Sequence, residues 1–108
     1  MENKKTVFLA DASEEFRAML QEAIERDGEF AVMGSAGDGR VALERLGTQR
    51  PDLLVMDVAL PGLDGLGLLQ KLKEQEGTMP KTIIVSAFCG NQVLADAEKL
   101  GVSYYLPK

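Results

Sequence analysis

The chain alternates short apolar runs with longer segments in which apolar and polar residues recur at helical spacing. The apolar runs have the length of strands and lie at about residues 5–11, 30–35, 53–57, 82–86 and 102–106. Helical patterns lie between them, at about residues 13–26, 38–48, 65–76 and 90–100. This alternation is typical of βα units and predicts an α/β fold with a five-stranded parallel sheet.

The spacing of apolar residues also predicts which side of each helix is buried. Ser13 is the expected N-cap of the first helix, with Glu14 and Glu15 favourable in its first turn. We expect each helix to bury one apolar face, namely Phe16, Met19, Leu20, Ala23 and Ile24 in the first, Val41, Ala42 and Leu46 in the second, and Leu66, Leu69 and Leu72 in the third.

Composition limits the classes of function. The chain has 108 residues, 45% of them hydrophobic, which is enough for one domain with its own core. No apolar run approaches the roughly 20 residues of a membrane helix, and the N-terminus lacks the apolar stretch of a signal peptide. Cys89 is the single cysteine, so no intrachain disulfide can form and a cytoplasmic location is expected.

Charge and the absence of histidine narrow the chemistry further. The net charge is −5 and no block of Lys and Arg is present, so direct binding of nucleic acid is not expected. The chain has no histidine, which excludes a Ser-His-Asp or Cys-His arrangement and an imidazole metal ligand within it. Any histidine needed for the function therefore has to come from a partner.

Four predicted strands end at residues that can bind phosphate or metal: Asp11, Asp57, Ser86 and Lys108. The carboxyl ends of parallel strands share one edge of a sheet, so these side chains are expected to converge there. A carboxylate can accept a phosphoryl group, although both groups are anionic and repel each other. A divalent cation and an ammonium relieve this repulsion. Asp57 would be the acceptor, Asp11 would help to hold Mg2+, and Lys108 would contact the phosphoryl oxygens.

Each of these residues also has an ordinary structural explanation. Asp11 taken alone is most simply a helix N-cap, Ser86 a turn residue and Lys108 a solvated charge. Tyr105 lies in an apolar strand and is typical of a core residue. A glycine-rich segment at residues 34–39 follows a strand, but its spacing does not match the dinucleotide-binding fingerprint. The joint arrangement of the four strand-end residues is what favours a site.

Nearly the whole chain resembles the receiver domain of two-component response regulators, the CheY-like family. The matching segments are residues 7–11 (VFLAD), 57–65 (DVALPGLDG), 84–87 (IVSA) and 101–108 (GVSYYLPK). The resemblance implies a doubly wound, flavodoxin-like sheet with strand order 2-1-3-4-5. Within the family, residues 63–66 (LDGL), 86–88 (SAF) and 103–105 (SYY) look most like the sporulation-initiation regulators.

The resemblance implies a role for each matching residue. Asp57 would take a phosphoryl group from a phosphohistidine on a histidine kinase or phosphotransfer protein. Asp11 matches the first member of an acidic pair that binds Mg2+, and the backbone carbonyl of Ala59 matches a further ligand. The domain would be a signalling module, not an enzyme with its own substrate, and would catalyse only its own phosphorylation and dephosphorylation.

The remaining matches concern the bound phosphoryl group and the response to it. Ser86 would bond the phosphoryl group, assisted by the backbone amide of Ala87, and Lys108 would pair with it. Tyr105 matches an aromatic residue that swings inward as Ser86 moves, which converts a local charge event into a change of surface. The resemblance also implies an output domain, DNA-binding in character, that lies outside this chain.

One residue departs from the family pattern. Ala12 stands where the family has its second acidic residue, so Mg2+ binding is predicted to be weak unless a water, Glu14 or Glu15 takes that place. This leaves open a pseudo-receiver, a constitutive interaction or dimerisation module that has lost phosphorylation. A small hydrolase or transferase with Asp57 as nucleophile and a flavodoxin-like cofactor carrier are further alternatives.

The sequence ends at Lys108, directly after the fifth predicted strand. We interpret residues 1–108 as a receiver domain truncated at its C-terminus, because a doubly wound sheet normally has another helix beside the first one. The face that such a helix covers is expected to be exposed, which predicts low stability or self-association as a homodimer.

Overall fold

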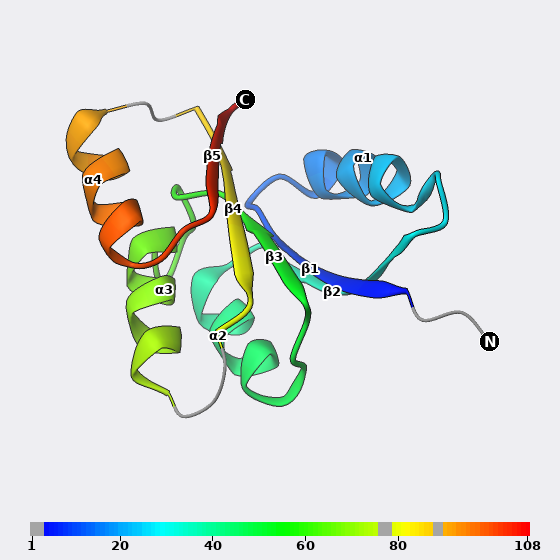
Figure 1. The fold of residues 1–108 in the computed structure, drawn as a ribbon, viewed down its shortest axis with the longest axis horizontal. Helices are drawn as coiled ribbons and strands as arrows, with labels where there is room; N and C mark the ends of the chain where they lie inside the picture. Colours follow the sequence, from blue (N-terminus) through cyan, green and yellow to red (C-terminus); the bar gives the residue numbers. More distant parts are fainter. Residues whose placement is uncertain (1–3, 76–78, 88–89) are drawn as a thin grey trace.

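Five parallel strands form one sheet in the order β2-β1-β3-β4-β5, which confirms the predicted fold class and strand order. The computed structural model describes residues 4–75, 79–87 and 90–108 (Figure 1). The predicted strand limits differ from the observed ones by one or two residues. The strands are β1 (Lys5–Ala10), β2 (Phe30–Ala36), β3 (Leu53–Met56), β4 (Lys81–Ser86) and β5 (Tyr104–Pro107).

Four helices connect the strands: α1 (Glu14–Glu25), α2 (Gly39–Thr48), α3 (Gly65–Glu74) and α4 (Asn91–Lys99). Side-chain oxygens cap the first three, because Ser13, Asp38 and Asp64 each accept hydrogen bonds from backbone amides of the first turn. The predicted N-cap Ser13 is therefore confirmed. The predicted end of the third helix at Glu76 lies outside the described residues, and so does Cys89.

The helices cover the two faces of the sheet unequally. Helix α1 lies alone on one face, whereas α2, α3 and α4 lie on the other (Figure 1). Successive strand residues point to opposite faces, so Val7 and Leu9 pack toward α1 while Phe8 and Ala10 belong to the core on the other side. The core under α2, α3 and α4 is the larger one, and α1 itself has no fully buried residue.

Three of the predicted core positions are wrong. Met19 is 56% exposed, Ala23 is exposed, and Val41 is 38% exposed. Helix α1 contacts the sheet through a narrow stripe that includes Leu20 and Ile24, and both Met19 and Ala23 lie beside this stripe. In α2 the buried residues are Gly39, Ala42 and Leu46, so Val41 lies outside the contact as well.

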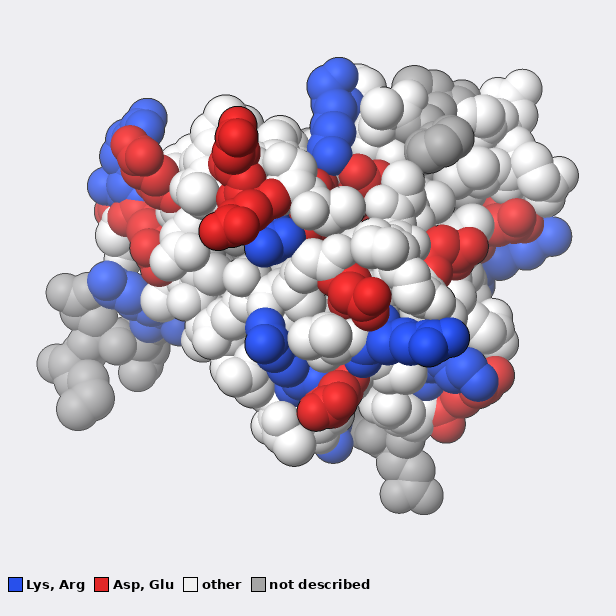
Figure 2. Space-filling view, turned by 180° about the vertical axis from the view of Figure 1, so that it is seen from behind, with Lys and Arg blue, Asp and Glu red and all other residues white. Residues whose placement is uncertain are grey.

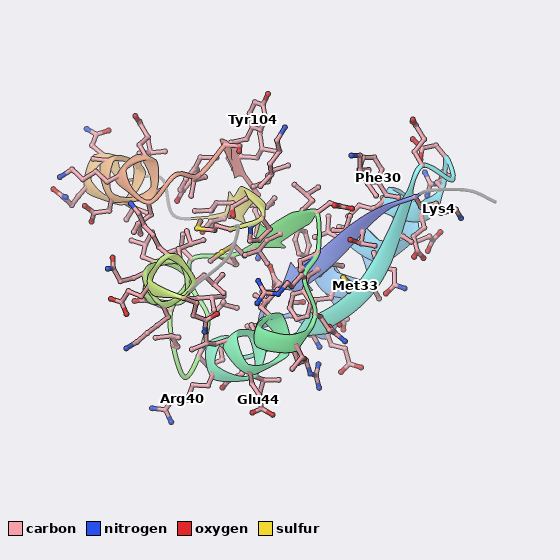
Figure 3. The ribbon with its side chains drawn as sticks, turned by 60° about the horizontal axis from the view of Figure 1, so that its bottom comes forward. Lys4, Phe30, Met33, Arg40, Glu44 and Tyr104 are labelled. Carbon is pink, nitrogen blue, oxygen red and sulfur yellow. The ribbon has the colours of Figure 1, made fainter. Side chains whose placement is uncertain are left out.

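Strand β5 forms one border of the sheet and exposes large side chains. Tyr104 and Leu106 are 66% and 48% exposed, and Figure 3 shows Tyr104 pointing away from the body of the molecule. They alternate with Tyr105, which packs against the larger core, and their register partners Ile83 and Val85 belong to the α1 face. The α1 face is therefore open at the β5 end of the sheet. Among the described residues, no helix is long and apolar enough to span a bilayer.

Candidate functional site

The carboxyl edge of the sheet brings three buried polar side chains and one ammonium together. Asp11 follows β1, Asp57 follows β3, and Ser86 ends β4; they are 3%, 6% and 0% exposed. Lys108 follows β5, and its Nζ lies 2.7 Å from Asp57 Oδ2 and 2.9 Å from Asp11 Oδ2. Asp11 and Asp57, from two different strand ends, thus share the Lys108 ammonium.

The two carboxylates are held in the same way. Oδ1 of Asp11 accepts a hydrogen bond from the backbone N–H of Ser13 at 2.9 Å, and Oδ1 of Asp57 accepts one from the N–H of Ala59 at 3.0 Å. Each aspartate therefore uses one oxygen to close a local turn two residues ahead. The second oxygen of each, Oδ2, is left facing the Lys108 ammonium.

Backbone bonds and an aromatic ring place Lys108. Its N–H donates to the Ser86 carbonyl at 3.0 Å, which continues the β4–β5 ladder by one more bond. Its Nζ lies 4.5 Å from the centroid of the Phe16 ring, a distance at which a cation and an aromatic face attract each other. The side chain is only 26% exposed. The ammonium is therefore a fixed part of the site and not a solvated charge.

Burial and pairing act in opposite directions on the acid–base properties of Asp57 and Lys108. Burial favours the neutral carboxyl, but hydrogen bonds from Lys108, the Ala59 N–H and the Ser86 hydroxyl outweigh it and lower the pKa of Asp57. Burial likewise disfavours the ammonium, but its hydrogen bonds to Asp57 and Asp11 raise the pKa of Lys108. Both groups are therefore charged over the whole physiological pH range.

The loop after Asp57 is fixed by close backbone contacts. The N–H of Gly65 donates to the Val58 carbonyl at 2.8 Å, and the N–H of Gly39 donates to the Pro61 carbonyl at 2.9 Å. A Cβ atom at Gly39 would lie 1.7 Å from the Leu63 carbonyl oxygen, and one at Gly65 would lie 2.6 Å from the backbone carbonyl oxygen of Asp57. Only glycine permits these approaches, so α2 and α3 together fix the loop that carries Ala59.

The sequence of residues 7–108, which includes all of these site residues, matches the response regulator receiver domain family. The chain belongs to this family. The resemblance inferred from the motifs is thereby confirmed at the level of the family, while the narrower likeness to sporulation-initiation regulators stays a prediction.

Solved receiver domains agree with the fold. The signal receiver domain of the putative response regulator NarL from Mycobacterium tuberculosis is 26% identical with a TM-score of 0.90, over 98% of this chain and 85% of that one. The response regulator domain of Thermotoga maritima CheB is 25% identical with a TM-score of 0.90, over 98% and 79%. A LuxR-family two-component response regulator from Aurantimonas sp. is 26% identical with a TM-score of 0.89, over 98% and 75%.

The oxygen donors of this receiver domain fit Mg2+, which receiver domains in general bind for phosphorylation. The carboxylates of Asp11 and Asp57 already converge on one cation, the Lys108 ammonium, and carboxylate and carbonyl oxygens are what Mg2+ prefers. Side-chain ligands other than Asp11 and Asp57 are lacking in the described part of the chain. Ala12 has no donor side chain, Glu14 and Glu15 are exposed, and the described residues hold no group of three metal-ligating side chains.

The other predicted site residues are Ser86, Ala87 and Tyr105, and of these Ser86 contacts a carboxylate of the pair. Ser86 is fully buried and its hydroxyl bonds to Asp57; Ala87 follows it and is exposed. Tyr105 is half-buried and packs against the core under α2, α3 and α4. The alternative explanation of Asp11 as a helix N-cap is wrong, because Ser13 caps α1.

Two residues that belong to the site were not predicted as part of it. Phe16 was assigned to the helix core, yet its ring contacts the ammonium. Gly39 lies in the glycine-rich segment whose spacing does not fit a nucleotide site, and it contacts the loop after Asp57. The helical spacing of Phe16 places it near the end of β1, but no sequence signal specifies the partner of its ring.

Proposed function

We propose that this receiver domain accepts a phosphoryl group on Asp57 from a phosphohistidine of a histidine kinase or phosphotransfer protein. The observation that carries the proposal is the pairing of a buried strand-end carboxylate with a fixed ammonium, at 2.7 Å. In the reaction, an oxygen of the Asp57 carboxylate forms a bond to phosphorus as the N–P bond of the donor breaks. The electron pair of that bond stays on the imidazole, which leaves and takes up a proton.

The residues around Asp57 would stabilise the charge that moves during transfer. The Ala59 N–H holds Oδ1, so the carboxylate keeps its orientation. Lys108 can follow the negative charge from Oδ2 to a phosphoryl oxygen without leaving the site. The Ser86 hydroxyl and the Ala87 N–H would donate to the other phosphoryl oxygens. Donors that are in place before the reaction are what electrostatic catalysis requires.

We assign the Mg2+ ligands to Asp11, Asp57 and the Ala59 carbonyl. A bound Mg2+ supplies further neutralisation of phosphoryl oxygens. Because Ala12 provides no carboxylate, we expect weak binding and slow labelling by small phosphodonors.

The switch that we propose involves Ser86 and Tyr105. The two residues lie on adjacent strands, since Ser86 pairs with Pro107 and Tyr105 pairs with Ile84. A shift of Ser86 toward a phosphoryl group would open space along β4, and Tyr105 would turn further into the core. The exposed side chains of β5 would then change their arrangement, which gives a partner a surface to detect.

The output would be a DNA-binding domain outside this chain, as the family resemblance implies, and a LuxR-family two-component response regulator is among the similar structures. The receiver itself is ill-suited to DNA, because its net charge is −5 and acidic and basic side chains are interspersed on the face in Figure 2. A cytoplasmic location fits this partnership.

Self-association through the open part of the α1 face is a further expectation, and size-exclusion chromatography over a range of concentrations tests it.

Intact-mass spectrometry tests the proposal directly. After incubation with acetyl phosphate or a phosphohistidine protein and Mg2+, we expect the mass of one phosphoryl group on the wild-type chain. The Asp57→Asn variant should gain none, whereas Asp27→Asn, at an exposed turn, should be labelled like the wild type. Equal labelling of the wild type and Asp57→Asn would contradict the assignment.

One observation favours a second candidate, the pseudo-receiver. The ammonium already bridges both carboxylates and offsets one of their two negative charges, and Ala12 adds no further carboxylate, so the resting site attracts a metal less strongly. In this case the fold would act as a constitutive interaction module. Beryllofluoride with Mg2+ separates the two, because a spectral change that depends on Asp57 occurs only in the phosphoacceptor.

A further inference from the structure

The Lys108 ammonium has three contacts, and one of them is not with an acid. Two carboxylate oxygens lie at 2.7 and 2.9 Å from Nζ, and the centroid of the Phe16 ring lies at 4.5 Å. An ammonium has three N–H donors, and the face of an aromatic ring attracts a cation at this distance. Phe16 thus restrains the cation that bridges the two carboxylates.

The position of the ring does not depend on Lys108. The Phe16 N–H donates to the Ser13 hydroxyl at 3.1 Å, which fixes the first turn of α1. The neighbouring Arg17 donates from its guanidinium to the Asp11 backbone carbonyl at 2.5 Å, so the same turn is tied to the end of β1. The ring itself borders a small apolar space that is also lined by Leu20 and Val85. The ring is therefore a fixed surface against which the ammonium is held.

This arrangement sets the ammonium against a metal ion. The oxygens that contact Lys108 are the Oδ2 atoms of Asp11 and Asp57, and these two carboxylates are also the acidic ligands assigned to Mg2+. A cation that occupies both oxygens lowers the negative charge that a second cation would meet. With alanine at position 12, no further carboxylate restores that charge.

We propose that Phe16 is a positioning residue that holds the Lys108 ammonium between Asp11 and Asp57, and that it thereby sets the balance between this internal cation and Mg2+. Its effect on phosphorylation rests on the proposed function, whereas its effect on Mg2+ affinity does not. Removal of the ring should free the ammonium. Mg2+ should then bind more tightly, while phosphoryl transfer at saturating Mg2+ should slow down because Lys108 is no longer in place.

The test compares Phe16→Leu, which keeps an apolar side chain without a ring, with Phe16→Tyr, which keeps the ring. For Phe16→Leu we expect an Mg2+ affinity about two- to fivefold higher by calorimetry, which corresponds to the usual strength of an ammonium–aromatic contact. We expect the phosphorylation rate at saturating Mg2+ to fall by a similar factor. Phe16→Tyr should restore both values, and Met19→Leu, at an exposed position of the same helix, should change neither.

Opposite signs of the two changes separate positioning from loss of structure, because a distorted site would lose both affinity and rate. An Mg2+ affinity that is unchanged or lower in folded Phe16→Leu overturns the inference. If Asp57 is not phosphorylated in any variant, the proposed function fails, but the affinity comparison still decides the role of Phe16.

A measurement on the wild-type chain covers the case in which Phe16→Leu does not fold. The ε-methylene protons of Lys108 should be shifted upfield in the NMR spectrum by the Phe16 ring. Titration with Mg2+ should reduce this shift, with the same midpoint as Mg2+ binding, as the ammonium leaves the two carboxylates. A shift that persists at saturating Mg2+ shows that the two cations do not compete, and it also overturns the inference.

Discussion

The ends of β1 and β3 carry the same polar contact in two different settings. Asp11 and Asp57 both bind an N–H two residues ahead through Oδ1 and the same ammonium through Oδ2. After Asp11, Ala12 and Ser13 are exposed and α1 begins at once. After Asp57, Val58 and Leu60 are buried, and the first residue of α2, Gly39, packs against the loop that follows β3. The contact of each Oδ1 depends on the local turn alone, whereas the rigidity of the surrounding loop depends on packing.

This difference suggests a division of labour. The β3 end offers a carboxylate in a fixed frame, which suits the residue that forms a bond. The β1 end offers a carboxylate beside an open position, which suits a cation site that can gain or lose a ligand. Four tests probe this comparison, from the largest expected effect to the smallest.

The first test removes each carboxylate in turn. Asp57→Asn should abolish phosphoryl incorporation, because the amide has no nucleophilic oxygen of comparable strength. Asp11→Asn should only slow it, by at least about fivefold, since one charge of the cation site is lost. Intact-mass kinetics with acetyl phosphate measures both. Equal loss in the two variants would mean that the two strand ends do not differ in role.

The second test loosens the frame of the β3 end. Gly39→Ala places a Cβ against the Leu63 carbonyl, and overpacking of this kind typically costs about 1–3 kcal/mol of unfolding free energy. Gly47→Ala is the matched control in the same helix, because its Cβ would meet nothing within 4 Å. It should stabilise the chain by about 0.4–1 kcal/mol. Urea denaturation measures the stability of both variants, and equal stability would contradict the close packing of Gly39 against the loop after Asp57.

The third test fills the open position at the β1 end. Ala12→Asp should raise Mg2+ affinity by about fivefold, since a third carboxylate near the ion contributes on the order of 1 kcal/mol in a water-like medium. Ala12→Asn adds similar volume without charge and should have a smaller effect. Calorimetric titration compares the two. No change in Ala12→Asp would show that water or another residue already fills the position.

The fourth test uses pH. The pKa of Asp57 is lowered in the folded chain, because the hydrogen bonds from Lys108 and Ala59 outweigh the effect of burial. Between the lowered pKa and the ordinary one, the unfolded chain therefore binds more protons than the folded chain. The resulting stability is present above the ordinary aspartate pKa of about 3.9 and is lost as pH falls through the lowered value. Acid unfolding should therefore be shallower in Asp57→Asn than in the wild type. Identical acid limbs would mean that the pairing contributes nothing to stability.

The sequence was sufficient for the features that depend on local pattern. Strand–helix alternation gave the class of fold, and the family resemblance gave the strand order. The turn chemistry at Ser13 gave the start of α1. Residues at the carboxyl ends of neighbouring strands must meet at one edge, so the convergence of Asp11, Asp57 and Lys108 also followed from topology.

Features that depend on how elements approach each other were not accessible. Met19 and Val41 have the right periodicity for a core, yet the contacts of their helices are too narrow to include them. Gly39 shows no sign in sequence that its hydrogen atoms face a carbonyl oxygen. The neighbour of the Phe16 ring is 92 positions away (108 − 16) and is set only by the folded sheet.

The attachment of Lys108 to the sheet has one more consequence. Its amide forms the last rung between β4 and β5, and β5 has β4 as its one neighbour in the described sheet. Fraying of this border strand would carry the positive charge away from both aspartates in a single movement. Amide hydrogen exchange at Lys108 should therefore report how often the acidic pair is left without its counter-ion. Any ligand that lies along the outer edge of β5 should slow this exchange, because it keeps the strand, and with it the ammonium, in place.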